Sequence, residues 1–257
     1  MTDASLARLV AEHFGACVYE FGANSLVSTS FEGGGFQGSY SDINHPFGSI
    51  FGPQPGATAF DTAPCVGLIK GRGKPAAWLV GEGPAATTTG EELTAAGFVR
   101  VDDLAGMSVA LATLREPVMP EGFTVRLVSE RDDWESLVSI AQQVYGLPPG
   151  SGTIFDSFFG KDVSALGFYQ GEPVACSMTY VVDGVAGLYT VGVLPDCRGK
   201  GYGAAVSSVP MVWHRDAGRE LGVLQASAMG RPVYLRLGWK DCGTCPMYVY
   251  LPNPQAG

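Results

Sequence analysis

Glycine and cationic residues are concentrated in one short stretch of the C-terminal half, and their spacing suits the binding of an anion. The stretch runs Arg198-Gly-Lys-Gly-Tyr-Gly-Ala204 and places three glycines within five residues. Glycine lets the backbone turn closely around a ligand because it has no Cβ, and the free N–H groups that begin a helix attract negative charge. The stretch therefore predicts a binding site for a pyrophosphate.

A strand and a helix are expected to position this stretch. Asp183-Gly184 predicts a hairpin turn that leads into the strand. Residues 188–194 alternate between two sets of side chains, as β-strands do, and Pro195 with Asp196 ends the pattern. A helical run begins at Ala204 and ends near Gly218. A strand, a tight glycine loop and a helix would bring backbone amides together at the helix start.

Two motifs in this region resemble those of a known superfamily. Arg-Gly-x-Gly-x-Gly after a strand that ends in Val-x-Pro resembles motif A of the GNAT superfamily of N-acetyltransferases, whose loop holds the pyrophosphate of acetyl-CoA. Residues 224–239 resemble motif B, a strand and a helix closed by Tyr234-x-x-x-Gly238-Trp239. A lone glycine triplet also occurs in dinucleotide folds and plain turns, so the resemblance rests on both motifs together. It implies the GNAT fold, an α/β (α+β) architecture with a mixed, mostly antiparallel sheet flanked by helices.

The resemblance also assigns contacts with acetyl-CoA. It implies that main-chain groups of Val191 and Val193 polarise the thioester carbonyl and bind pantetheine, where their strand parts from residues 223–227. A solvated loop lysine is the alternative for Lys200. The implied pyrophosphate contacts are side-chain charge from Arg198 and Lys200 and the amides of Arg198, Gly199, Gly201, Gly203 and Ala204.

Tyr234 occupies the position of the superfamily's general acid. A phenol with a pKa of about 10 stays protonated at neutral pH and can donate a proton to the departing sulfur. The alternative is a tyrosine that only packs against the coenzyme arm. Ser227 lies seven residues earlier, where the family often has asparagine. Its shorter hydroxyl can still hydrogen-bond pantetheine, but with less reach.

A general base is missing from the place where many relatives have one. They carry a glutamate at the start of the central strand, where this chain has Gly187, and no carboxylate lies between Gly184 and Pro195. Either water relays the proton of the acceptor, or a residue from elsewhere accepts it. The nameable candidates, each with a purely structural role as its alternative, are Tyr189, Asp183, Glu172 and Asp156.

Composition narrows the classes of partner. The 257 residues carry a net charge of −9 and show no basic cluster, which argues against a nucleic-acid or anionic-membrane surface. No apolar run of roughly 18 residues predicts a membrane span. The early acidic Asp3, with no basic leader, predicts no signal peptide, so a cytoplasmic protein is expected. The acidity either suits a cationic amine substrate or serves solubility alone.

Cysteines and histidines form no strong metal-binding pattern, and we expect no metal. Six cysteines are scattered except for Cys242-Gly-Thr-Cys245, whose spacing is compatible with a redox motif or two zinc ligands. A β-hairpin turn before a final strand over 247–251 is the preferred interpretation. The histidines lie far apart in the sequence and are interpreted as structural: His13, His45 and His214.

The N-terminal half shows signs of an internal repeat. A strand, a helix and a strand are predicted within residues 76–111, in the same order as within 223–251, but no Arg-Gly-x-Gly-x-Gly stretch accompanies them. This order predicts a degenerate GNAT-like domain over 1–117 and an active one over 122–257. Residues 31–56 are rich in glycine and proline, so we expect a long loop there, either packed on the body or closing over substrate.

The leading hypothesis is an acetyl-CoA-dependent N-acetyltransferase that transfers an acetyl group to the amine of a small molecule by direct attack. The absent glutamate at Gly187 and the serine at 227 motivate a second hypothesis, a GNAT-fold enzyme that uses another acyl-CoA for transfer or decarboxylation. A third hypothesis is a catalytically silent CoA-binding module.

Overall fold

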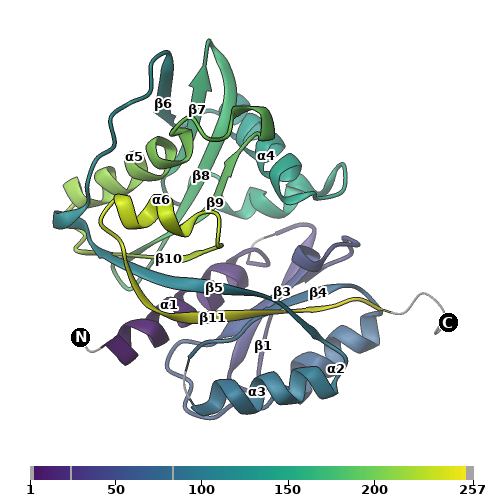
Figure 1. Ribbon diagram of the computed structural model, residues 1–257. Helices are drawn as coiled ribbons and strands as arrows, with labels where there is room; N and C mark the ends of the chain where they lie inside the picture. Colours follow the sequence, from purple (N-terminus) through teal and green to yellow (C-terminus); the bar gives the residue numbers. More distant parts are fainter. Residues whose placement is uncertain (1–2, 24, 83, 253–257) are drawn as a thin grey trace. The chain divides into compact units, whose positions relative to one another are not determined.

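The structure is a computed structural model of the chain and describes residues 3–23, 25–82 and 84–252 (Figure 1). It divides into two units, the first comprising Met1–Gly106 with Cys242–Gly257 and the second comprising Met107–Asp241. The predicted domains 1–117 and 122–257 stay a prediction, and the two units are described in turn.

The first unit is a sheet with three helices among its described residues. Neighbouring strands follow the order β1-β2-β3-β4-β11-β5. β3 and β4 run parallel, whereas the pairs β1–β2, β2–β3 and β4–β11 are antiparallel. Its elements are α1 (Asp3–Glu20), β1 (Ser28–Gly33), β2 (Phe36–Ser41), η1 (Pro46–Gly48), β3 (Ser49–Pro53), α2 (Ala63–Arg72), β4 (Ala76–Leu79), α3 (Pro84–Ala95), the first part of β5 (Val99–Ala110), and β11 (Lys240–Tyr250) from Cys242 onward.

An aromatic cluster around Trp78 forms the core of this unit. The indole is fully buried, and its ring centroid lies 4.8 Å from that of Phe36, 5.6 Å from that of Phe51 and 6.0 Å from that of Phe98. Aromatic pairs at such distances add about 0.5–1.5 kcal/mol each to the gain from burial. The residues 31–56 supply two of these rings, so they belong to the core.

The prediction of a long loop over residues 31–56 is therefore wrong, since β1, β2 and β3 occupy most of this range. Its glycines make turns and close contacts rather than breaking strands. Gly34 and Gly35, with φ of 62° and 79°, join β1 to β2 in a tight hairpin. A Cβ on Gly52 would lie 3.0 Å from the Cα of Gly15, so the glycine in β3 lets α1 pack directly against the strand.

The prediction of a turn at Cys242-Gly-Thr-Cys245 is also wrong, because both cysteines lie inside β11. The strand extends because β4 and its flanking residues provide hydrogen bonds along its length. Val80 N donates to Pro246 O at 2.9 Å, and Thr244 N donates to the Glu82 carboxylate at 2.6 Å. The two cysteines are not joined by a disulfide, and Cys242 Sγ donates to Gly106 O at 3.3 Å.

The second unit contains the predicted strand–loop–helix. Its strand order is β5-β10-β9-β8-β7-β6, with β9 and β10 parallel and the pairs β6–β7, β7–β8 and β8–β9 antiparallel. Its elements are the end of β5, η2 (Leu111–Thr113), β6 (Phe123–Leu127), α4 (Arg131–Tyr145), η3 (Ser151–Phe158), β7 (Ser164–Tyr169), β8 (Glu172–Val182), β9 (Val185–Val193), η4 (Pro195–Cys197), α5 (Tyr202–Asp216), β10 (Leu221–Ala226) and α6 (Arg231–Arg236).

The predicted α/β class with a mixed, mostly antiparallel sheet is confirmed. Asp183 and Gly184, with φ of 50° and 82°, form the predicted hairpin turn between β8 and β9.

The helices α4 and α5 cover opposite faces of the second sheet, as Figure 1 shows for the strands β7 and β8. The alternation of β8 side chains establishes this arrangement. Cys176 lies on the α4 side, since a Cβ on Gly192 would meet both Cys176 Sγ and Val144 of α4. The next residue, Ser177, faces α5, where its hydroxyl donates to Val206 O at 2.7 Å.

This serine contact compensates for a proline inside α5. Pro210 has no backbone N–H, so the carbonyl of Val206, four residues earlier, loses its helical donor. Ser177 is fully buried, and its hydroxyl supplies the missing hydrogen bond. A side chain of the sheet thus stabilises the helix that carries the glycine loop.

Replacing Ser177 by alanine is expected to lower the free energy of unfolding by about 1–3 kcal/mol, because a buried carbonyl is left without a donor. The loss should fall below about 1 kcal/mol in a Pro210→Ala background, where the restored N–H can donate to Val206. Urea unfolding of the four chains measures both losses. Equal losses in the two backgrounds would contradict this role of Ser177.

Candidate functional site

The strands β9 and β10 pair only at their beginnings and then part. The parallel register joins Ala186 to Gly222 and Gly187 to Val223, and it stops there. On its other side, β9 stays paired with β8 as far as Val193. The backbone edge of residues 188–193 that faces β10 is therefore outside the ladder, as the resemblance to the superfamily implied for Val191 and Val193.

A β-bulge lies in the same part of β9, in its pairing with β8. Cys176 pairs with Gly192 and Met178 with Tyr189, so Thr190 and Val191 together oppose the single residue Ser177. Thr190 has a φ of 50°, a left-handed conformation that is unfavourable for a β-branched residue. Strain of this kind costs about 1–3 kcal/mol and is commonly found at functional sites.

The glycine loop follows β9 and leads into α5. Gly199 and Gly201 have φ of 77° and 86°, which glycine adopts without penalty. Gly201 is the N-cap of α5 and offers no side chain, and the first helical bond of this end runs from Ala205 N to Gly201 O at 3.2 Å. The amides of Tyr202, Gly203 and Ala204 therefore have no partner within the helix, which leaves them suitable for an anion.

The two cations of the loop are bonded to its backbone. Arg198 Nε donates to Val193 O at 3.1 Å, and Lys200 Nζ donates to Asp196 O at 3.5 Å. The Lys200 ammonium also lies 5.6 Å from the centre of the Tyr169 ring. Both residues belong to the loop that leads directly into α5, where their charges favour a bound anion.

Tyr234 is buried in α6, with 8% of its surface exposed. Burial raises the pKa of its phenol to about 12, and the nearby Ser207 hydroxyl opposes the shift only in part. Ser207 belongs to α5, so Tyr234 lies on the α5 face of the sheet. Its ring meets Trp239 edge-on at 6.0 Å, and the two predicted motif residues therefore pack together.

Ser227 is exposed and takes part in the turn before α6. Its hydroxyl accepts a hydrogen bond from Gly230 N at 3.2 Å, and its carbonyl accepts another from Arg231 N at 2.9 Å. The side chain thus has a turn-forming contact in addition to the pantetheine contact that the resemblance implies.

The structure places the carboxylates considered as general bases in positions with no clear catalytic role. Asp156 accepts hydrogen bonds from Trp134 Nε1 at 2.9 Å and from the Arg131 guanidinium at 3.1 Å. Asp183 lies in the exposed β8–β9 turn. Gly187 is buried between Tyr180 and Val223, with no carboxylate in its position.

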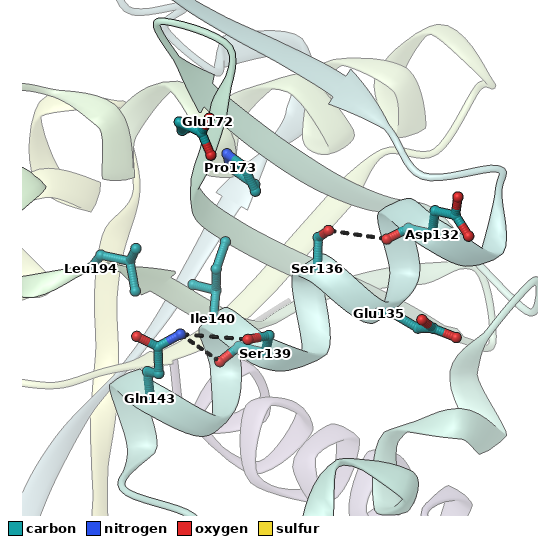
Figure 2. Close-up of a pocket in the computed structure, with 9 residues that line it drawn as sticks. All are labelled: Asp132, Glu135, Ser136, Ser139, Ile140, Gln143, Glu172, Pro173 and Leu194. Atoms are coloured by element: carbon teal, nitrogen blue, oxygen red, sulfur yellow. Dashed lines mark hydrogen bonds between the residues drawn. The ribbon is translucent and has the colours of Figure 1, made fainter.

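Glu172 lines a cavity of about 390 Å³ between α4 and the start of β8 (Figure 2). The walls of this cavity include none of the residues predicted to bind the coenzyme. They are Asp132, Glu135, Ser136, Ser139, Ile140, Gln143, Glu172, Pro173 and Leu194.

Tyr145 and Cys176 are residues near the bulge that the motifs did not indicate. The Tyr145 hydroxyl donates to Val191 O at 3.3 Å, and Cys176 Sγ donates to Thr190 O at 3.5 Å. Tyr145 belongs to neither motif, and Cys176 is one of the scattered cysteines. No local pattern distinguishes them, because their partners lie more than a dozen residues away.

His214 has a structural role, because its ring is buried and hydrogen-bonded inside the second unit. The fully buried ring approaches Thr179 Oγ1 with Nε2 at 2.8 Å. The Thr179 hydroxyl donates its own proton to Val163 O, so the histidine must donate through Nε2. Burial, together with the charge of Arg219, lowers the pKa of His214 to about 4.

This shift makes His214 a source of acid lability. The unfolded chain binds a proton at the ordinary pKa near 6.5, whereas the folded chain does so only near 4, so the free energy of unfolding should fall as the pH falls between these values. Asp162, whose pKa burial raises, acts in the opposite direction. Urea unfolding at pH 7 and pH 5 should show a smaller loss for His214→Gln than for the wild type, and parallel losses would contradict this role.

Membrane-spanning helices and metal-binding clusters are both missing among the described residues. None of the helices described is both long and apolar enough to cross a membrane. No group of three or more His, Cys, Asp or Glu side chains in the described ranges is arranged to hold a metal ion.

Comparisons with known proteins agree with this geometry. Residues 131–239 match the model of the Acetyltransferase (GNAT) family. The GCN5-related N-acetyltransferase from Kribbella flavida is 21% identical, with a TM-score of 0.70 over 98% of this chain and 97% of that one. The GCN5-related N-acetyltransferase from Sphaerobacter thermophilus is 16% identical, with a TM-score of 0.60 over 99% and 95%. A search of curated proteins found no match.

A tandem arrangement is also represented among the similar structures. A tandem GNAT protein from the clavulanic acid biosynthesis pathway is 11% identical, with a TM-score of 0.58 over 98% of this chain and 95% of that one. The predicted fold is thereby confirmed over nearly the whole chain. The family match supports acyl transfer from CoA to an acceptor. Residues 131–239 thus match the GNAT acetyltransferase family model, in a chain whose fold is that of GNAT structures, a tandem GNAT protein among them.

Proposed function

We propose that the protein is an N-acetyltransferase that transfers the acetyl group of acetyl-CoA to the amine of a small molecule by direct attack. The observation that supports this most strongly is the parting of β9 from β10 directly before the amides that begin α5. A pantetheine arm can pair with the edge of β9 while its pyrophosphate meets these amides. The contact residues are those that the motifs predicted: Val191, Val193, Arg198, Gly199, Lys200, Gly201, Gly203, Ala204 and Ser227.

The reaction needs one bond to form and one to break. The neutral amine attacks the thioester carbon, a C–N bond forms, and the C–S bond breaks to release CoA as a thiolate. Main-chain groups of β9 near Val191 would stabilise the negative charge on the carbonyl oxygen. Tyr234 would give its phenolic proton to the sulfur and be reprotonated by solvent.

Water is the proposed acceptor of the proton that the amine releases. The central strand carries no carboxylate, and Asp156 is engaged by two donors. The amine must then lose its proton to solvent before attack, so the rate should rise with pH until the amine is neutral. The net charge of −9 favours the approach of a cationic acceptor.

The direct test is to incubate the purified chain with acetyl-CoA and a panel of small amines, and to measure thiol release and acetylated product by mass spectrometry. Propionyl-CoA and malonyl-CoA in parallel reactions distinguish acetyl transfer from the use of another acyl group. Thiol release with only a longer acyl-CoA, or loss of CO₂ from malonyl-CoA, would replace the proposal. Binding of CoA by calorimetry without turnover of any acyl-CoA would indicate a CoA-binding module.

A further inference from the structure

The bulge in β9 leaves two carbonyl groups outside the β8–β9 ladder. Thr190 and Val191 have no partner in the register between Met178 and Cys176. Buried backbone carbonyls without donors are costly, at about 1–3 kcal/mol each. Both oxygens nevertheless have donors, and both donors are side chains. They are the thiol of Cys176 at 3.5 Å and the phenol of Tyr145 at 3.3 Å.

The two donors lie together on the α4 face of the sheet. Cys176 is fully buried in β8 and Tyr145 is the last residue of α4. Gly192 lets the helix end approach, since a Cβ there would lie 3.2 Å from both Cys176 Sγ and Val144 Cγ2. The end of α4 therefore packs directly over the bulge.

Both donors keep their protons over the range in which an enzyme works. Burial, together with the charges of Cys176 and Tyr234, raises the pKa of Tyr145 above its ordinary value. Burial raises the pKa of Cys176 to about 12, although the Gly192 N–H opposes this shift. The hydrogen bonds to the bulge are therefore independent of pH near neutrality.

Tyr145 and Tyr234 reach the parted strands from opposite faces. Tyr145 belongs to α4, whereas Tyr234 lies beside Ser207 of α5. The charge of the Tyr234 phenol is nonetheless one of the causes that raise the pKa of Tyr145.

We infer that Tyr145 and Cys176 are positioning residues, whose two hydrogen bonds hold the Thr190 bulge so that the free edge of β9 is directed at the acyl thioester. This inference rests on the proposed function. Neither residue touches the reacting atoms in this role. They fix the backbone that does, and backbone misplacement of a fraction of an ångström at a reacting carbonyl is costly for the rate.

The test compares Tyr145→Phe and Cys176→Ala, which remove a donor, with Cys176→Ser, which keeps one. Hydrogen exchange followed by mass spectrometry on the free protein reports the bulge without any ligand. Peptides covering residues 188–194 should exchange at least about fivefold faster in Tyr145→Phe and Cys176→Ala, and within about twofold of the wild type in Cys176→Ser. Tyr250→Phe, in the first unit, is the control for loss of a phenolic hydroxyl.

Kinetics then link the bulge to the reaction. The kcat for acetyl transfer should fall about tenfold or more in Tyr145→Phe and Cys176→Ala, while the Kd for CoA stays within about threefold because the glycine loop is intact. Cys176→Ser should retain most of the wild-type kcat. Unchanged exchange and unchanged kcat in Tyr145→Phe would overturn the inference. A wild type without turnover would instead reject the proposed function, and the exchange experiment would still decide the role of both residues in holding the bulge.

Discussion

Replacing Gly201 by glutamate is expected to weaken the binding of acetyl-CoA by about 100-fold or more. The new carboxylate would stand at the N-cap of α5, beside the amides of Tyr202, Gly203 and Ala204 that have no helical partner. A like charge placed against a bound pyrophosphate costs several kcal/mol, and each 1.4 kcal/mol is about tenfold in Kd. Isothermal titration of acetyl-CoA into both chains measures the change.

The matched control for this substitution is Gly218→Glu. Gly218 has a φ of 85°, nearly that of Gly201 at 86°, and it follows the other end of the same helix. The positive φ gives both substitutions a similar backbone cost. A Cβ at Gly218 meets no atom, and one at Gly201 would meet only Pro120 Cγ at 3.3 Å. Only the substitution at Gly201 should change Kd. An equal loss of affinity in both chains would show that destabilisation, and not charge at the α5 start, is the cause.

Replacing Tyr234 by phenylalanine is expected to lower kcat about 100-fold or more, with little change in the Kd for CoA. The ring is buried against Trp239, and phenylalanine keeps this packing while removing the proton donor. General acid catalysis by a positioned group typically contributes about 10²–10⁴-fold. Steady-state rates with saturating acetyl-CoA measure the effect, and Tyr250→Phe in the first unit controls for loss of a hydroxyl.

The pH profile gives a second measurement of the same role. Because burial raises the pKa of Tyr234 to about 12, the phenol should remain protonated well above its ordinary range. Deprotonation of Tyr234 should therefore not lower the kcat of the wild type between about pH 8 and pH 10.5. Any decline in this range should occur in Tyr234→Phe as well. A decline with a midpoint near 10, lost in the variant, would contradict the buried environment. If the substitution leaves kcat unchanged, the role of Tyr234 is restricted to packing.

The parts of the fold that were predicted correctly are those whose structure is determined by residues within the same segment. The alternation along residues 188–194 indicated β9, the pair Asp183-Gly184 indicated the hairpin, and Pro195 ended the strand. Each of these signals lies within the segment that it describes. For the same reason the glycine loop was recognised from its residue types, since backbone access and a helix start depend on neighbours in the sequence.

The predictions that were wrong concern segments whose structure depends on residues far away in the sequence. Residues 31–56 are rich in glycine, yet most of them form strands. Gly52 leaves room for α1 to pack against β3, and aromatic rings of this segment pack on Trp78. Cys242 and Cys245 lie in a strand because β4 and Glu82 provide donors and acceptors to it. Glycine spacing and cysteine spacing do not distinguish these cases from turns.

The sequence by itself determined the class of fold, and it is the source of the proposed anion-binding role of the glycine loop and of the proposed role of Tyr234. Only the tertiary structure showed the bulge at Thr190, since a β-branched residue gives no sign of a left-handed conformation. It also brought Tyr145 and Cys176 to the carbonyls of that bulge from 46 and 14 residues away. Hydrogen bonds across such separations are set by the packing of a helix on a sheet, which no local pattern of residues contains.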